Sequence, residues 1–314
     1  MNYFHSSPLD ATKEIVIKTS LEKNKKIFIH QVEHAGYGAI LSRLMTGFNL
    51  SLVTKSNYYF EINSSYLIEE MFNIQVKKIP SDSQEIILWD FFQHTWNADL
   101  VTRAEHQFPC CPIDINPKIS RHQWCSILAN IIFGTPSKYL NEHIAKKKEE
   151  LNWKKYTRYI GLHVRRGDKS TENPIIPINV YVEHLNEIYK ANPGVNLGIY
   201  LSSDSEKTYE DLSRFLSKDL IVFDLNEKRY DNYNAGMVQQ NRELSLQESL
   251  TCAKNISILG DCDYVLGMST AQFTWLGGLL AVYNSKLDTT RHQMIDPFTN
   301  QKGHWANYYG FNLF

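Results

Sequence analysis

The chain has 314 residues, which is long enough for two domains of ordinary size, each with its own hydrophobic core. Its 43% hydrophobic and 12% aromatic residues exclude a disordered or fibrous protein. The formal net charge of -1 excludes a broadly basic domain, so we expect no nucleic-acid partner, and any anion has to be bound by local groups.

The cysteines and the N-terminal residues indicate in which cellular compartment the protein is expected. The five cysteines follow no zinc or redox spacing, and an odd, sparse set is typical of a reducing environment. No window reaches the roughly 18 apolar residues of a membrane span, and residues 1–29 lack the pattern of a signal peptide. We therefore expect a cytoplasmic protein without a membrane span.

The first half of the chain predicts a loosely regular α/β domain. Residues 1–24 are polar and weakly patterned, as in a surface arm. A strand at 26–30 is followed by a turn with Gly36 and Gly38 and then by a helix with an apolar face. This order places backbone amides where a phosphate can sit, although most such turns are turns only. Further along we predict strands at 51–54 and 86–92, a short helix at 66–72, an irregular loop at 93–117, and helices at 121–133 and 139–151.

The second half alternates more regularly between strands and helices. We predict strands at 159–164, 197–202, 220–223 and 264–268, and helices at 177–191, 206–216, 244–258 and 271–283. This alternation is typical of a parallel sheet covered on both faces. The sequence thus predicts an α/β fold with two domains facing a cleft, residues 1–152 and 153–314.

A charge cluster follows the strand at 159–164 and is the strongest candidate site. Ligands of open α/β folds bind outside the carboxyl ends of the strands, where Arg165, Arg166, Gly167 and Asp168 stand. Two guanidiniums match a diphosphate, but adjacent strand residues point to opposite faces unless the chain turns, which Gly167 permits. Alternatively, one arginine pairs with Asp168 and the other is solvated, and both interpretations remain open.

Other polar residues lie near the same predicted edge. Lys169 and Glu172 stand three apart, and a neighbouring cation favours the ionised carboxylate that a general base needs, although a surface pair would look the same. Asp204 follows the next strand and is also a candidate N-cap for the helix that begins at 206. His163 is either a core histidine or a residue that faces a nucleobase.

A rival pattern is Asp261-Cys262-Asp263. Two carboxylates spaced in this way hold a divalent cation in many metal-dependent glycosyltransferases. Here they precede an apolar run, as connections from a helix to a strand often do. We favour a structural role for both.

The order of these residues resembles the α1,6-fucosyltransferases, the family of the core N-glycan enzyme and the rhizobial nodulation enzymes. Residues 163–169, with Glu172, Pro177 and Tyr181, resemble the family's first motif, and residues 199–204 and 263–272 resemble its second and third. Residues 35–38 resemble its N-terminal glycine loop. The resemblance extends from about residue 26 to residue 314, in order and at matching intervals.

The resemblance implies two Rossmann-like domains in a GT-B-like arrangement, the first on the acceptor side and the second binding the nucleotide sugar. It also implies transfer of L-fucose from GDP-β-L-fucose with inversion, without metal or other cofactor, to a glycan acceptor, α1,6 to GlcNAc. Residues 93–117 and 224–242 would meet that acceptor.

The same resemblance implies a role for each matching residue. Arg165 and Arg166 would hold the β-phosphate, Glu172 would be the base beside Lys169, and His163 would meet guanine. The implied donor site is completed by Gly36, Tyr37, Gly38, Asp168, Tyr181, Asp204, Asn255, Thr270, Ala271 and Gln272.

The sequence departs from the family pattern at four places. Asn255 stands where the family has a carboxylate for guanine, and Ala271 where it has a serine near the β-phosphate, although Thr270 offers a hydroxyl. Ser205 replaces the second Asp of the second motif, and the loop before Glu172 is one residue shorter than in the core enzyme. Alternatives are a fucosyltransferase of another linkage (α1,2 or protein O-fucose), a metal-dependent glycosyltransferase using Asp261 and Asp263, and a silent sugar-nucleotide or glycan-binding protein.

Overall fold

The structure, a computed structural model, divides into two compact units, Met1–Ser137 and Lys138–Phe314. It describes residues 13, 16, 26–32, 36–53, 55, 57–62, 64, 66–74, 85–90, 118–166, 174–227 and 242–303. Within these ranges no helix is both long and apolar enough to cross a membrane. The division falls ahead of a helix, Lys138–Glu150, which packs within the second unit, whereas the sequence analysis divided the chain after residue 152.

The first unit contains a three-stranded parallel sheet in the order β2-β1-β3. Its helix α2 packs on β1 and β2, and α6 packs on α2. The elements are β1 (Lys26–Val32), α2 (Tyr37–Val53), β2 (Asn57–Ile62), α3 (Ile68–Met71), β3 (Glu85–Asp90) and α6 (Arg121–Phe133).

Local sequence explains the helices of this unit. The predicted apolar face of α2 is fully buried at Ile40, Leu44 and Phe48. Helix α6 begins with a capping box, in which Ser120 Oγ accepts from the Gln123 N–H and Gln123 Oε1 accepts from the Ser120 N–H. Both helices therefore form where their apolar patterns predict them.

Two predictions for the first unit are wrong. Residues 51–53 continue helix α2, because Leu50 and Leu52 extend its buried side, and the second strand is Asn57–Ile62. Part of the predicted surface arm also packs inside the unit, since Val16 is buried and Lys13 Nζ donates to Asn130 Oδ1 of α6 at 2.6 Å.

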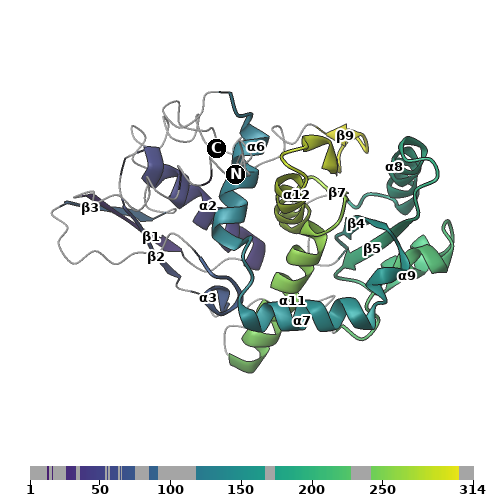
Figure 1. Ribbon diagram of the computed structural model, residues 1–314, viewed down its shortest axis with the longest axis horizontal. Helices are drawn as coiled ribbons and strands as arrows, with labels where there is room; N and C mark the ends of the chain where they lie inside the picture. Colours follow the sequence, from purple (N-terminus) through teal and green to yellow (C-terminus); the bar gives the residue numbers. More distant parts are fainter. Residues whose placement is uncertain are drawn as a thin grey trace, which may run out of the picture. The chain divides into compact units, whose positions relative to one another are not determined.

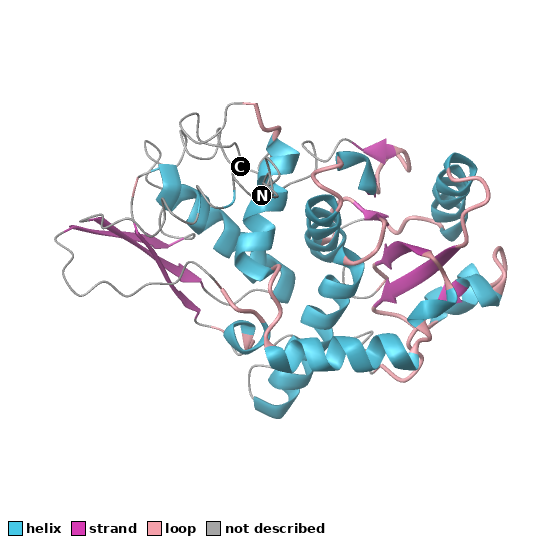
Figure 2. Ribbon diagram, viewed as in Figure 1, coloured by secondary structure: helices cyan, strands magenta, loops and turns pink. Residues whose placement is uncertain are grey.

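The second unit contains a six-stranded sheet in the order β6-β5-β4-β7-β8-β9, parallel except for β9. Strands β4 and β5 of this sheet lie side by side in Figures 1 and 2. Its helices are α7 (Lys138–Glu150), α8 (Ile178–Ala191), α9 (Lys207–Leu212), α11 (Arg242–Gly260) and α12 (Gln272–Asn284). Its strands are β4 (Arg158–Val164), β5 (Leu197–Ser203), β6 (Ile221–Val222), β7 (Tyr264–Met268), β8 (His292–Ile295) and β9 (Lys302–Gly303). Short 3-10 turns are η1 (Trp153–Lys155), η3 (Lys218–Leu220) and η4 (Thr289–Arg291).

Alternation along β4 assigns its two faces. Ile160, Leu162 and Val164 pack into a core with α8 and α9. Gly161 lies against Leu259 of α11, and His163 lies against α12 through Thr274. Helices thus cover both faces of the sheet, as Figure 2 shows for α8 and α12.

These observations confirm the predicted α/β fold with two Rossmann-like units, each built on a parallel sheet. The predicted strand at 264–268 and the helix at 121–133 match the structure. Helix α9 is shorter than predicted, and Leu220 belongs to η3 rather than to β6. The sequence analysis missed β8 and β9.

Candidate functional site

The strand order of the second unit locates its ligand site. The chain passes from β4 to β5 on one side, whereas β7 leads to β8 on the other, so β4 and β7 are the neighbouring strands where the direction changes. In open α/β sheets the crevice at the carboxyl ends of such strands binds the ligand. Here β4 ends at Val164, immediately before Arg165, and β7 ends at Met268.

Arg165 and Asp204 form an ion pair at this edge of the sheet. Arg165 Nη1 lies 3.1 Å from Asp204 Oδ2, and the two side chains are 29% and 17% exposed. The other oxygen, Asp204 Oδ1, accepts from the backbone N–H of Arg166 at 2.8 Å. Because the donors of a guanidinium match phosphate oxygens, an arginine held in place at a strand end suits an anionic ligand.

Asp204 was also expected to cap the next helix, and this is wrong. Helix α9 has Glu206 at its N-cap position, without a side-chain cap. Ser203 instead organises the turn, since its Oγ accepts from the Ser205 N–H and donates to Thr208 Oγ1. Asp204 is thereby left to bind the chain at the end of β4.

The charged groups at the end of β4 act on residues of both neighbouring helices. Burial raises the pKa of Glu248 on α11 and Arg165 lowers it, while burial raises the pKa of Tyr181 on α8 and Arg166 lowers it. Asp204 influences both His163 and Tyr181, so these charges act on residues of both faces of the sheet.

His163 is almost completely buried near the carboxyl end of β4. The residue is 5% exposed, and its ring stacks on Phe273, with centroids 5.6 Å apart and planes 19° apart. Its Nδ1 is 2.9 Å from Thr274 Oγ1. Burial lowers the pKa of His163 to about 4, Asp204 opposes this shift, and Arg165 adds to it. The imidazole is therefore neutral at pH 7.

Helix α12 begins beside His163 with an N-terminus suited to an anion. Its N-cap residue, Ala271, has no side-chain acceptor and provides no side-chain cap for the first turn, which opens at Gln272. The Thr270 hydroxyl oxygen is shielded from solvent and has no hydrogen-bond partner among the described residues. These three positions, predicted to line the donor site, stand together at the start of α12.

Tyr181 lies in the core rather than on an open surface. Its side chain is 1% exposed on α8, among the residues that pack under β4. Burial raises its pKa, which Arg166 lowers and Asp204 raises. The hydroxyl therefore remains protonated close to the arginine cluster.

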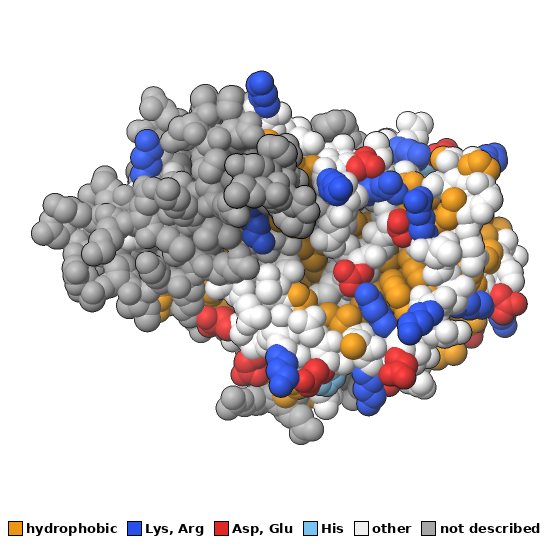
Figure 3. Space-filling model, viewed as in Figure 1, with side chains coloured by type: hydrophobic (Ala, Val, Ile, Leu, Met, Phe, Trp, Pro, Cys, Tyr) orange, Lys and Arg blue, Asp and Glu red, His pale blue; other side chains and the backbone are white. Residues whose placement is uncertain are grey.

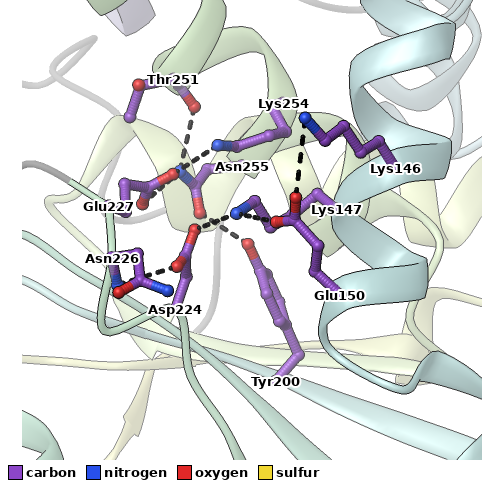
Figure 4. Close-up of polar contacts among 10 residues, drawn as sticks. All are labelled: Lys146, Lys147, Glu150, Tyr200, Asp224, Asn226, Glu227, Thr251, Lys254 and Asn255. Carbon is purple, nitrogen blue, oxygen red and sulfur yellow. Dashed lines mark hydrogen bonds and ion pairs between the residues drawn. The ribbon is translucent and has the colours of Figure 1, made fainter.

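Asn255, predicted to stand in the guanine site, is engaged inside the protein (Figure 4). Its Nδ2 donates to Glu227 Oε2 at 3.0 Å and to the Thr251 carbonyl at 2.9 Å, and its Oδ1 accepts from the Tyr200 hydroxyl at 2.6 Å. A carboxylate does lie beside Asn255, that of Glu227, which also pairs with Lys254 at 2.7 Å. Glu227 follows β6, and no spacing in the sequence connects it with Asn255.

Figure 4 also shows a second buried pair beside this cluster. Lys147 Nζ of α7 lies 2.7 Å from Asp224 Oδ2, with both side chains largely shielded. Despite the opposing effect of burial, hydrogen bonding and attraction by Asp224 and Glu150 raise the pKa of Lys147. Attraction by Lys147 likewise lowers the pKa of Asp224 against the effect of burial. The segment 224–227 is thus attached to α7 and α11 through charged groups.

Glu248 is a residue that the sequence analysis missed. It is partly buried on α11, and its Oε1 accepts from Cys252 Sγ at 3.6 Å. Burial raises its pKa, and Arg165 lowers it. Its position on a helix far along the chain gave no signal that it lies near Arg165.

The glycine turn belongs to the first unit. Gly36 is exposed, and its carbonyl accepts from the Ile40 N–H at 3.1 Å, opening α2. Tyr37 is buried and packs edge-to-face on Tyr66, with centroids 5.5 Å apart. The Gly38 carbonyl accepts from Ser42 Oγ at 3.0 Å. A side chain at Gly36 would meet no atom of the described residues within 4 Å.

Several predicted site residues lie outside the described residues. These are Gly167, Asp168, Lys169 and Glu172, together with residues 93–117.

The Asp261 and Asp263 pair lies at the opposite, amino-terminal end of β7. Asp261 Oδ2 pairs with Lys148 Nζ at 2.7 Å. Asp263 Oδ2 accepts from the Tyr159 N–H at 3.0 Å, where β4 begins. Both carboxylates therefore have structural partners, and the described ranges contain no cluster of three or more potential metal-ligating side chains.

Charge on the visible face of the second unit is mixed. Lys and Arg side chains are interspersed there with Asp and Glu, with hydrophobic side chains between them (Figure 3). The described residues form no broad basic patch on this face, so an anionic ligand would depend on local groups such as Arg165.

Comparison with known proteins supports the fold. No protein-family model matches the sequence, and no curated protein does. The α-1,6-fucosyltransferase NodZ soaked with GDP-fucose matches with a TM-score of 0.52 at 13% identity, over 90% of this chain and 98% of that one. A structure of NodZ from Bradyrhizobium gives 0.51 at 13% identity, over 90% and 97%. A variant of Arabidopsis thaliana FUT1 in complex with GDP gives 0.52 at 10% identity, over 85% and 72%.

The chain shares the fold of these fucosyltransferases. At such low identity the likeness is one of architecture, and the roles of individual residues depend on the local geometry described above.

Proposed function

We propose that the protein is a GDP-fucose-dependent fucosyltransferase. The observation that carries this proposal is Arg165, held by Asp204 at the carboxyl end of β4 beside the start of α12, whose N-cap residue provides no side-chain cap. This arrangement suits a diphosphate, and it occurs in a fold shared with enzymes whose structures contain GDP or GDP-fucose. The second unit would bind the nucleotide sugar, and the first unit the acceptor.

The proposed reaction is a single displacement at the anomeric carbon of fucose. An acceptor hydroxyl attacks this carbon from the face opposite the β-phosphate, the bond to the phosphate oxygen breaks, and GDP leaves. Glu172 takes the hydroxyl proton, with Lys169 keeping the carboxylate ionised. Arg165, with Arg166, stabilises the charge that develops on the leaving phosphate. The configuration of fucose is inverted.

The first experiment compares the effects on donor binding of replacing Arg165 and Arg158, which lie at opposite ends of β4. Arg165→Ala should weaken GDP-fucose binding by about 1.5 to 3 kcal/mol, or about 10- to 150-fold, because a charge-assisted hydrogen bond is lost. Arg158→Ala is the matched control, since Arg158 begins the same strand and pairs with Asp263. Calorimetry measures both affinities. Equal affinities for the two variants would refute the placement of the diphosphate.

The base test uses Glu172→Gln. Turnover should fall by about 10² to 10⁴ while GDP-fucose still binds, because only proton transfer is removed. Retention of the parent turnover would refute the role of Glu172.

The finer assignment is α1,6 transfer to GlcNAc. It is supported by the motif resemblance and by the likeness of fold to NodZ, whereas transfer with α1,2 linkage or to a protein hydroxyl is the alternative within the same chemistry. A panel of chitooligosaccharides, N-glycans, galactosides and folded peptide modules, with product linkage determined by NMR, separates these possibilities.

A silent nucleotide-sugar-binding protein is the second candidate, because the side chain of Asn255 is engaged internally where the family places a guanine-binding carboxylate. GDP binding without transfer to any acceptor and without hydrolysis of the donor would favour it. The metal-dependent alternative has less support, because Asp261 and Asp263 lie at the amino-terminal end of β7. Activity that is lost with a chelator and restored by a divalent cation would revive it.

A further inference from the structure

The hydroxyl of Thr274 has one hydrogen-bond partner among the described residues. Thr274 is fully buried in the first turn of α12, and its Oγ1 lies 2.9 Å from His163 Nδ1. If Nδ1 carried the ring proton and donated to Oγ1, the O–H of Thr274 would be buried without an acceptor. Leaving a buried donor unpaired is costly, so the hydroxyl donates and Nδ1 accepts.

This direction determines the tautomer of His163. The buried ring is neutral, so it carries one proton, and with Nδ1 as an acceptor that proton is on Nε2. Nε2 makes no hydrogen bond to any residue that the structure describes. It is also absent from the buried side-chain atoms that lack a hydrogen-bond partner. His163 therefore carries an N–H donor without a partner among the described residues, near the carboxyl ends of β4 and β7.

The surroundings keep the ring in this orientation. Phe273 stacks on the imidazole from the neighbouring position on α12. The close approach of the helix depends on Gly267 of β7, because a Cβ there would lie 2.3 Å from Thr274 Oγ1 and 2.7 Å from the His163 carbonyl oxygen. The donor is thus held by contacts from both α12 and β7.

We propose that Thr274 is a positioning residue that holds His163 as the Nε2–H tautomer, so that the site selects a nucleotide base with a hydrogen-bond acceptor at the facing position. This inference rests on the proposed function. Among purines, guanine has a keto oxygen at position 6, whereas adenine has an amino group there. An N–H donor can pair with the keto oxygen and opposes the amino group. Thr274 therefore contributes to base selection without touching the base.

The first test observes the tautomer without any nucleotide. Nitrogen-15 NMR of the full chain should show the ring proton of His163 on Nε2, with the resonance assigned by its loss in His163→Gln. Thr274→Val should shift this ring toward a mixture of tautomers, and Thr274→Ser should restore Nε2–H. A proton on Nδ1 in the unmodified protein would overturn the inference, whatever the protein's activity.

The second test measures base selection by calorimetry with GDP, IDP and ADP. IDP keeps the keto oxygen but lacks the 2-amino group. Thr274→Val should weaken GDP and IDP binding about three- to tenfold, the range of one hydrogen bond, and narrow their preference over ADP. Thr274→Ser should retain the preference. An unchanged ratio of GDP to ADP affinity in Thr274→Val would refute the role in selection.

The two tests separate the inference from the proposed function. If the unmodified protein binds none of the three nucleotides, the proposed function and base selection both fail, while the NMR result still decides whether Thr274 sets the tautomer. If Thr274→Val is unfolded, as circular dichroism would show, Thr274→Ser and the unmodified protein carry the comparison. A tautomer on Nδ1 in either of them is then the refuting result.

Discussion

The burial of His163 predicts that the protein loses stability as the pH falls below 6.5. In the folded state the pKa of His163 is lowered to about 4, from an ordinary value of 6.5. Above pH 6.5 the ring is neutral in both states and contributes no pH dependence. As the pH falls below 6.5, the unfolded chain binds a proton and the folded chain does not, so the free energy of unfolding decreases until the folded pKa is reached.

The magnitude follows from the shift. At about 1.4 kcal/mol per pKa unit, His163 should cost about 3 kcal/mol of stability between pH 6.5 and pH 4. The groups whose charges act on the ring are Asp204, which opposes the shift, and Arg165, which adds to it. Burial is the largest cause, so added salt should change the effect little.

The assay compares the unmodified protein with His163→Gln, which cannot titrate at this position. Urea unfolding at several pH values between 7.5 and 4.5, read by hydrogen exchange in β4 and α12, reports the second unit separately from the first. At pH 7.5 the difference in the free energy of unfolding between the two proteins measures the effect of the substitution on packing alone. From there to pH 4.5, the unmodified protein should lose about 2 to 3 kcal/mol more than the variant. A baseline difference that stays constant over this range would refute the burial argument.

Three further predictions follow from single contacts. Gly267→Ala should destabilise the second unit by about 1 to 3 kcal/mol through overpacking, because its Cβ would lie 2.3 Å from the buried Thr274 Oγ1. Gly36→Ala is the control and should change the free energy of unfolding by less than about 0.5 kcal/mol, because its Cβ would meet no atom of the described residues within 4 Å. Glu227→Gln should lower the free energy of unfolding, measured by chemical denaturation, by about 3 kcal/mol, because it leaves the charge of Lys254 shielded and unpaired. Replacing both residues with Leu should recover much of this loss. If stability is not recovered, the unpaired charge of Lys254 is not the cause. Asp261→Asn should leave the rate of fucosyl transfer within about twofold of the unmodified protein, because the ion pair of Asp261 with Lys148 is partly exposed and lies at the amino-terminal end of β7. A larger loss of activity would support the metal-dependent alternative.

Regular hydrophobic patterning made most elements of the chain predictable. Strand β7 and helix α6 match their predicted bounds, because in each case an apolar pattern ends where capping or charged residues begin. The failure at 51–53 has an equally local cause: Leu50, Leu52 and Val53 form a short apolar run that fits either a strand or the continuing helix. Periodicity alone does not separate these two in so few residues.

The candidate site was predictable only in part. Adjacent arginines after a buried strand identified the edge of the sheet, because parallel strands expose their carboxyl ends together. The partner of Arg165 was open at that stage, and the structure supplies Asp204 from the next strand. The N-cap expectation failed because the same carboxylate is used to bind the end of β4.

By itself, the sequence determined the alternating strands and helices, the sheet edge at Arg165 and the departure at Asn255, because these depend on residues near one another in the chain. Only the tertiary structure decided that Thr274 lies on His163, 111 residues away, and that Glu227 reaches Asn255. Such contacts depend on how helices pack across the sheet, and a short hydrogen bond between distant residues leaves no periodic trace in either segment. Packing is therefore the physical reason that the ring of His163 has one neutral form, with one donor that has no partner among the described residues.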